Sequence, residues 1–526
     1  MRRLTFIALA STLATLPIAA QHDHGKSGDK LGAVSFSTSC APAVEQQFNT
    51  AMAMLHSFWF DEANKTFTAV ASADTSCAMA HWGVAMTAWG NPFVRQPLGA
   101  EQQRRGLAAA ERAADLSARA SHREQMYIEA ALALWRDADK ADHLVRLGRH
   151  EAAMRKLYET HAEDPEAAMF YARALIANAA PTDLAFTSQL RAASLLEPLF
   201  AKQPDHPGLA HYIIHTFDSP KLANQGLSAA RRYASIAPAA PHALHMPSHI
   251  FTRLGLWDES IQTNRRSAAA EPDSNAAVHP NDYLVYAYLQ EGRDREARDV
   301  VVRTRTASDR FYGAVLGYNA AAMQARFALE RSAWAEAAAL AVPDKSAPFI
   351  EGVARFARAL GAARSGNKSQ AVAEVAVLAA LSDTLRARKD SYWATILDAQ
   401  RLAASAWVAR AEGKNDEALR LAREGAELEE TVEKHPVTPG PLLPARELEG
   451  DLLLELGRPA DALRSYELTL GREPRRARAL FGAARAAEKA GNAVAAKRRY
   501  TELLALMNRA DASRGEVKVA RAFLRL

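Results

Sequence analysis

The sequence lacks the signals of several common protein classes. After residue 20, no stretch is apolar enough to cross a membrane. The formal net charge is only +5, acidic and basic residues are interspersed, and no basic stripe indicates a nucleic-acid interface. A nucleophile elbow, a phosphate-binding loop and a dinucleotide fingerprint are also missing. We therefore expect neither a nucleic-acid partner nor a membrane span in the mature chain.

The first 20 residues have the pattern of a secretory signal. Arg2 and Arg3 precede the apolar run Leu4–Ile18, and two alanines then supply small residues for cleavage. The apolar run is short for a membrane span, and an uncleaved anchor is the alternative. We predict that residues 1–20 are removed and that the mature protein is periplasmic or secreted.

Beyond the signal, the chain changes from a polar lead to a helical repeat. Residues 21–40 are largely polar and lack periodicity, which predicts a disordered lead. From Ala41 onward, apolar residues recur at helical spacing, with glycine and proline at regular breaks. Near the C-terminus, a small residue, a turn glycine, an alanine and an aromatic residue recur after about 34 positions. The first set is Gly450, Gly457, Ala462 and Tyr466, and the second is Ala484, Gly491, Ala496 and Tyr500.

This order of residues resembles the tetratricopeptide repeat, a hairpin of two helices. The small residue and the alanine let the helices approach closely, and the glycine makes the turn between them. The resemblance implies an all-α, right-handed solenoid of roughly ten or eleven helical hairpins. The motifs HSFWFDEA, CAMAHWG and HALHMPSHIF are similar to those of exported bacterial tetratricopeptide-repeat proteins, a likeness that implies no particular activity.

The array is expected to have two parts. Residues 41–434 form the N-terminal and central repeats, and residues 445–526 form C-terminal repeats that end in a capping helix. Between them, residues 435–444 (HPVTPGPLLP) are rich in proline and interrupt the helices. We interpret this break as a candidate hinge between the two parts.

The two cysteines, Cys40 and Cys77, are expected to form a disulfide in an oxidising compartment. In the stacked array, Cys40 precedes the first helix of one repeat and Cys77 begins the first helix of the next. Their helix ends would therefore be neighbours. In the chain-entropy model such a bridge contributes roughly 3–4 kcal/mol. Two free buried thiols are the alternative.

Histidines recur at matching positions in three consecutive repeats, which begin at Pro207, Pro241 and Val278. Positions three, four or seven apart share one stripe of a helix. The matching residues are His211 and His215, then His242, His245 and His249, then His279, Asp282 and Tyr286. By the tetratricopeptide resemblance, this stripe lines the concave groove of the array.

Imidazoles that converge from neighbouring helices can bind a transition metal. Two histidines four apart project from one helical face, and adjacent helices pack about 8–10 Å apart. Two such pairs could supply four nitrogen ligands, or three together with Asp282, to one divalent ion such as zinc or copper. The alternative is a polar groove whose histidines hydrogen-bond a peptide, water or one another. Asp218, Arg253 and Tyr286 are the predicted groove residues for such a partner.

Pro247 divides the histidine stretch. A proline inside a helix removes one backbone hydrogen bond and clashes with the preceding turn. If a new helix begins at Pro247, His242 and His245 lie on the preceding turn. His211, His215 and His249 are then the safer metal ligands.

The leading functional prediction is an exported binding scaffold. Its groove would hold a peptide or protein partner, and its histidine patch a divalent metal. A periplasmic protein that handles copper or zinc is the first alternative. A metal-dependent hydrolase is the second, although the stretch from His211 to His215 lacks the glutamate that a zinc peptidase places after its first histidine. Asp218 or Asp282 would then be the candidate base.

Overall fold

The chain is an array of α-helices. The computed structural model describes residues 30–526 except 96, 272–276 and 309–313, so the predicted signal and residues 21–29 of the lead lie outside the described residues. The described residues form helices joined by short connections, without a β-strand. The predicted all-α solenoid of helical hairpins is therefore confirmed. None of the described helices combines the length and the apolar character needed to span a membrane.

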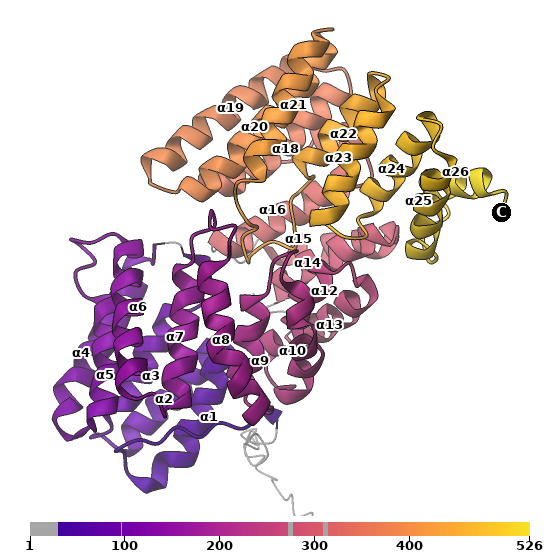
Figure 1. Cartoon of the computed structure of the whole chain (residues 1–526). Helices are drawn as coiled ribbons and strands as arrows, with labels where there is room; N and C mark the ends of the chain where they lie inside the picture. The colour runs from indigo at the N-terminus through magenta and orange to yellow at the C-terminus, as the bar shows by residue number, and fades with distance from the viewer. Residues whose placement is uncertain (1–29, 96, 272–276, 309–313) are drawn as a thin grey trace, which may run out of the picture.

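The first half of the chain forms a stack of helices in which sequence neighbours pack side by side (Figure 1). Its helices are α1 (Glu45–His56), α2 (Phe60–Ala73), α3 (Ala78–Trp89), α4 (Ala100–Leu116), α5 (His122–Trp135), α6 (His143–Thr160), α7 (Pro165–Asn178), α8 (Thr187–Lys202), α9 (Pro207–Thr216) and α10 (Ala223–Ile236). Short 3-10 helices interrupt the connections at η2 (Pro42–Val44), η3 (Pro92–Val94) and η4 (Ser117–Arg119). One apolar core begins at Leu31, extends through this stack and continues beyond α10 to Phe251.

The middle of the chain joins this stack to a second one, and Figure 1 shows α14 and α16 between the two. The middle helices are α11 (Pro241–His245), α12 (Pro247–Arg253), α13 (Trp257–Ala270), α14 (Val278–Gln290), α15 (Asp294–Ser308) and α16 (Ala314–Leu329). The later helices are α17 (Trp334–Ala338), α18 (Pro348–Arg364), α19 (Lys368–Ala387), α20 (Ser391–Ala411), α21 (Asn415–Glu429), α22 (Ala445–Glu455), α23 (Pro459–Arg472), α24 (Ala477–Lys489), α25 (Ala493–Leu506) and α26 (Gly515–Leu524).

The C-terminal hairpins show why the repeat pattern specifies this fold. Gly457 follows α22 with a φ of +72°, a conformation that side chains other than glycine rarely adopt. Gly450 and Gly482 both lie against the ring of Tyr466, and an added Cβ would come within 2.9 Å and 2.3 Å of that ring. Gly450 and Tyr466 of the pattern, together with Gly482, therefore set the close packing of α22, α23 and α24.

The prediction of disorder is wrong for residues 30–40. Phe36 is buried, and its ring centroid lies 5.2 Å from that of Tyr127. The main-chain nitrogen of Ala33 donates to the carbonyl of Asp205 at 3.0 Å. Apolar side chains within this short segment anchor it along the first stack, despite its polar composition.

The predicted disulfide joins Cys40 and Cys77, which are 37 residues apart. Cys40 precedes η2, and Cys77 immediately precedes α3. The bridge therefore links the starts of two consecutive repeats, as the array geometry predicts. The carboxylate of Asp74 reinforces this corner by accepting from the main-chain nitrogen of Ala41 at 2.8 Å.

The C-terminal repeats pack back onto the middle of the array. Helices α24–α26 share one apolar cluster with residues of α13, α14 and α15. The indole nitrogen of Trp257 donates to the carbonyl of Arg475 at 3.1 Å, across 218 positions of sequence. Gly255 has a φ of +65°, and an added Cβ would lie 2.5 Å from the carbonyl oxygen of Pro474. The turn before α13 therefore needs glycine both for its conformation and for this contact.

Candidate metal centre

Six histidines of α9, α11, α12 and α14 lie close together in the structure. The three repeats begin at the predicted residues, with α9 at Pro207, α11 at Pro241 and α14 at Val278. The histidine stretch is divided as expected, because α11 ends before Met246 and α12 begins at Pro247. The first residue of each of these three repeats is therefore predicted correctly.

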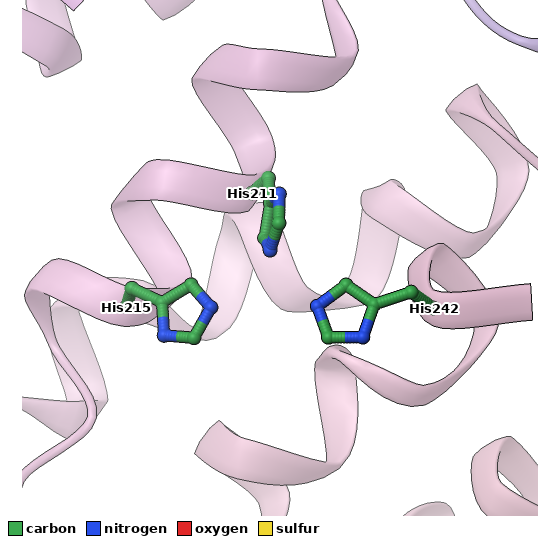
Figure 2. A group of neighbouring side chains, drawn as sticks. All are labelled: His211, His215 and His242. Atoms are coloured by element: carbon green, nitrogen blue, oxygen red, sulfur yellow. The ribbon is translucent and has the colours of Figure 1, made fainter. Parts of the chain in front are cut away.

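The six imidazoles form two groups and not one. The first triad consists of His211, His215 and His242, and the second triad of His245, His249 and His279. Within each triad, one ring nitrogen from each residue lies within 4.8 Å of the others. Figure 2 shows the three rings of the first triad turned toward a common space, with two on one helix and the third opposite them. The structure thus separates the predicted ligands into two sets of three.

The first triad presents three nitrogens without partners. Nδ1 of His211 donates to the main-chain carbonyl of His56 at 2.6 Å, so its Nε2 carries a lone pair. Within the described part of the chain, nothing hydrogen-bonds the buried Nε2 atoms of His211, His215 and His242. Buried polar atoms in proteins are nearly always satisfied. Three such atoms in one place form a ready set of metal ligands.

The second triad places two lone pairs face to face. Nδ1 of His245 donates to Oδ1 of Asn264 at 2.6 Å, and the Asn264 amide orientation is set by its donation to the carbonyl of Ser260. Nδ1 of His249 donates to the carboxylate of Asp218 at 2.8 Å. The two Nε2 atoms, 3.0 Å apart, therefore both carry lone pairs when the rings are neutral. A cation bound by both nitrogens would convert this repulsion into attraction.

Burial keeps the imidazoles in the neutral form that binds metals. Burial lowers the pKa of His211 to about 3 and the pKa of His245 to about 4. It also lowers the pKa of each of the other four well below 6.5, and neighbouring imidazoles lower it further.

Nδ1 of His279 is buried and, among the described residues, has no hydrogen-bond partner. The second triad therefore also offers a free nitrogen.

The two triads are neighbours and share a cavity of about 240 Å³. The ring centroid of His215 lies 5.5 Å from that of His249, which joins the triads directly. Five of the six histidines line the cavity, together with Phe58, Phe60 and Val437 among other uncharged residues. A second cavity, of about 360 Å³, adjoins the first at His215. The triads thus have room beside them for a small ligand.

Asp282 belongs to neither triad, although its sequence position grouped it with the histidines. Its carboxylate pairs with Arg326 at 3.2 Å and accepts from the amide of Asn319 at 3.1 Å. Burial raises the pKa of Asp282, and these two partners oppose that rise. The carboxylate is therefore already used by an internal ion pair.

The three predicted groove residues are also buried and bonded within the chain. Asp218 accepts from Nζ of Lys434 at 2.7 Å as well as from the second triad. Arg253 pairs with Glu473 at 3.2 Å. The hydroxyl of Tyr286 accepts at 3.0 Å from an arginine that precedes α24. These side chains hold parts of the chain together at the positions where sequence reasoning places a partner.

The proline-rich segment 435–444 lies inside the array and against the triads. Arg326 donates to the carbonyl of Pro441 at 2.7 Å, and Asn319 donates to that of Val437 at 2.7 Å. Val437 itself lines the histidine cavity. These bonds join residues 115 and 118 positions apart, a separation at which local sequence patterns predict nothing.

Sequence reasoning also missed the residues that orient the triads. The carbonyl of His56 and the amide oxygen of Asn264 each accept from Nδ1 of a triad histidine and leave its Nε2 for the triad. Lys434 neutralises Asp218 behind the second triad. None of these residues stands at a metal-ligand spacing from a histidine of the motif, so no signal in the chain identifies them.

His56 and His206 form another histidine cluster, which differs from the two triads because all its ring nitrogens have hydrogen-bond partners. His56 and His206 each contact the buried carboxylate of Glu166 at 3.0 Å. The other nitrogen of His56 contacts the hydroxyl of Tyr212 at 2.9 Å, and that of His206 accepts from the main chain of Gly208 at 3.1 Å. This network joins α1, α7 and α9 through hydrogen bonds that use all four of these ring nitrogens.

Comparisons with known proteins assign no family. No protein-family model matches the chain, and no curated protein matches it. Among solved structures, the chain is similar to the hetero-tetramer Cut9–Hcn1 of the APC/C, with 13% identity, a TM-score of 0.30, and coverage of 91% of this chain and 89% of that chain. It is also similar to a monomeric mutant of IFIT1 with Gppp-AAAA, with 12% identity, a TM-score of 0.37, and coverage of 82% and 90%.

Proposed function

We propose that the protein binds two transition-metal ions, one in each histidine triad. The observation that carries this proposal is the set of buried imidazole nitrogens without hydrogen-bond partners in the described part of the chain. Each buried polar atom left unpaired costs about 1–3 kcal/mol. In the first triad three Nε2 atoms converge, so a single ion would satisfy all three at once.

The bonds made by the opposite ring nitrogens support the same proposal. A carbonyl, an amide oxygen and a carboxylate accept from Nδ1 of His211, His245 and His249 respectively. Partners of this kind fix the tautomer of a metal-binding histidine and increase its basicity. In a merely polar groove, the same nitrogens would be free to turn toward water or a peptide.

The ligand set also limits the kind of ion. Imidazole suits zinc, copper and nickel, and neither triad includes a carboxylate or a thiolate. Three protein ligands leave a coordination position open, as in catalytic metal sites. The proposed ions would therefore be able to bind a further small ligand in the shared cavity.

Metal content tests the proposal. The mature protein, purified without a histidine tag and supplied with zinc or copper, should contain two ions per chain by elemental mass spectrometry. His242→Ala should lose the ion of the first triad and His279→Ala that of the second, so each should retain one. His122→Ala is the matched control because His122 is exposed and lies on α5, which contributes no residue to either triad, and it should retain two.

Loss of folding would also lower metal content, so it is measured separately. Circular dichroism and thermal unfolding of the metal-free variants establish whether each is folded. His242→Gln, which keeps most of the side-chain volume, provides a second removal of the ligand nitrogen. A folded wild type that takes up no zinc or copper, or variants that retain both ions, would contradict the proposal.

A protein or peptide partner remains a second proposal. The observation that favours it is the helical-hairpin scaffold itself, an architecture whose extended inner surface suits protein binding. Because Asp218, Arg253 and Tyr286 are already bonded internally, we place the partner elsewhere on the array. Cross-linking followed by mass spectrometry should recover a specific partner from the native source, and recovery equal to that of an unrelated helical protein would contradict it.

We also propose that the protein is exported to the periplasm or secreted. The disulfide between Cys40 and Cys77 supports this, because such bonds persist in oxidising compartments. Cell fractionation and N-terminal sequencing of the mature protein test it. Recovery in the cytoplasm with residues 1–20 still attached would contradict both export and cleavage.

A further inference from the structure

The charges beside the triads indicate which metal they suit. All ligands of both triads are neutral imidazoles, so the triads supply no negative charge to offset the ions. Three buried carboxylates near them are each paired with a basic side chain. These pairs are Asp218 with Lys434, Asp282 with Arg326, and Glu473 with Arg253.

If each triad holds an ion, the two ions repel each other and the neutral ligands do not offset this repulsion, so a low charge on each ion is favoured. At a given distance and dielectric, the repulsion of two doubly charged ions is four times that of two singly charged ions. Burial weakens solvent screening and makes the difference larger. Among the metals that imidazole binds well, copper is the one with a stable singly charged state. The neutral triads therefore suit a pair of Cu(I) ions better than a pair of zinc ions.

The shared cavity indicates the kind of molecule that reaches the ions. No acidic side chain, lysine or arginine lines it, so it suits a neutral ligand. Its volume of about 240 Å³ exceeds the roughly 150 Å³ of an engineered cavity that binds benzene. The space is therefore sufficient for one aromatic ring with small substituents.

Aromatic side chains at the cavity wall suit a flat ring. Phe58 stacks on Phe60 with centroids 4.9 Å apart, and on His242 with centroids 5.5 Å apart and an interplanar angle of 16°. Both phenylalanines line the cavity beside imidazoles of the two triads. A ring held on this wall would contact the ligands of both ions.

We infer that the two triads hold a copper pair that oxidises a neutral one-ring diphenol with dioxygen. This inference rests on the proposed function. Each diphenol loses two electrons and two protons to become a quinone. One dioxygen accepts four electrons and four protons from two diphenols, its O–O bond breaks, and two waters form. Each copper alternates between Cu(I) and Cu(II), so the pair transfers the two electrons of one diphenol.

The test uses the full mature chain and catechol. The protein is loaded with two equivalents of Cu(I) without oxygen, its copper content is measured, and air and catechol are then added. An oxygen electrode and quinone absorbance should show two catechols oxidised per dioxygen, with saturation in catechol. His242→Ala and His279→Ala should each lower kcat by about 100-fold or more, since even outer-shell changes cost 10–100-fold. His122→Ala should stay within about twofold of wild type, because it touches neither triad.

A second variant tests the substrate wall without removing a ligand. Phe60→Ala should keep both copper ions and raise KM for catechol by about fivefold, the loss expected for one aromatic contact. A protein that binds two ions through the triads, but oxidises catechol no faster than the same amount of free copper, would overturn the inference and leave the proposed function intact. Two bound zinc ions with no uptake of Cu(I) would do the same. A folded protein that binds no ion would overturn both.

Discussion

Asp218 links metal binding to stability, because one buried carboxylate serves both the second triad and a buried lysine. Its carboxylate accepts from Nδ1 of His249 at 2.8 Å and from Nζ of Lys434 at 2.7 Å. Asp218→Asn keeps the shape of the side chain and removes its charge. The contact with His249 orients a proposed metal ligand, and the contact with Lys434 neutralises a buried positive charge.

The two contacts predict effects of different size. Removing one partner of a buried ion pair leaves the other charge uncompensated and costs about 3–5 kcal/mol. The Lys434 side chain is 7% exposed, so solvent relieves little of this cost. Loss of the partner that orients a metal-binding histidine weakens metal binding by about 10–100-fold. Asp218→Asn should therefore show both a loss of stability and a loss of affinity.

A double variant separates the two effects. Asp218→Asn with Lys434→Met removes the charge pair as a whole, and replacement of a buried pair by groups of similar volume is often neutral. Most of the lost stability should return, while the metal affinity of the second triad should remain about 10–100-fold weaker than in wild type. Lys434→Met alone leaves Asp218 without its ion-pair partner, so it should also lose stability, and it completes the double-mutant cycle.

Urea unfolding of the metal-free proteins measures the stability, and titration with copper against a competing chelator measures the affinity. The reasoning is refuted if the double variant recovers affinity together with stability, because Asp218 would then act on the metal only through folding. It is equally refuted if Asp218→Asn leaves stability unchanged, because Lys434 would then not depend on this partner.

Three further predictions concern the scaffold. Burial alone would raise the pKa of Glu447, but two neighbouring arginines hold this pKa below 4.5. The contribution of Glu447 to stability is therefore present above about pH 4.5 and lost as the pH falls. In urea unfolding, Glu447→Gln should cost about 3–5 kcal/mol at neutral pH and weaken this pH dependence. Cys77→Ser should lower the free energy of unfolding by about 4 kcal/mol, and dithiothreitol should then have no further effect. Gly255→Ala should lose about 1–3 kcal/mol by thermal unfolding, and more than its control Gly457→Ala, which also has positive φ but no neighbouring atom within 4 Å of the added Cβ.

Local signals in the sequence were sufficient to locate the repeats of the site. Proline at the first turn and glycine after the last turn of a helix act through their own backbone, and they need no knowledge of distant contacts. Pro207 and Pro241 therefore mark helix starts in both sequence and structure. Pro247 divides the histidine stretch for the same reason.

The division into two triads could not be predicted in the same way. His242 and His245 are three residues apart on the short helix α11, yet they belong to different triads. His245 and His249 belong to one triad although a helix break separates them. Membership depends on which neighbouring helix each side chain meets, with α9 supplying the partners of His242 and α12 and α14 those of His245. Spacing along one helix therefore identified the ligands without identifying their partners.

The segment 435–444 changes what the inner surface of the array can do. In an open solenoid, a stripe of histidines faces water, which satisfies the ring nitrogens and keeps their pKa near 6.5. Here the segment covers the stripe, and Val437 closes one side of the cavity. The residue before the segment, Lys434, pairs with the carboxylate that orients His249. Lys434 and the segment that follows it thus contribute both to the burial of the imidazoles and to the charge behind them, so the packing of this stretch and the environment of the two triads depend on each other.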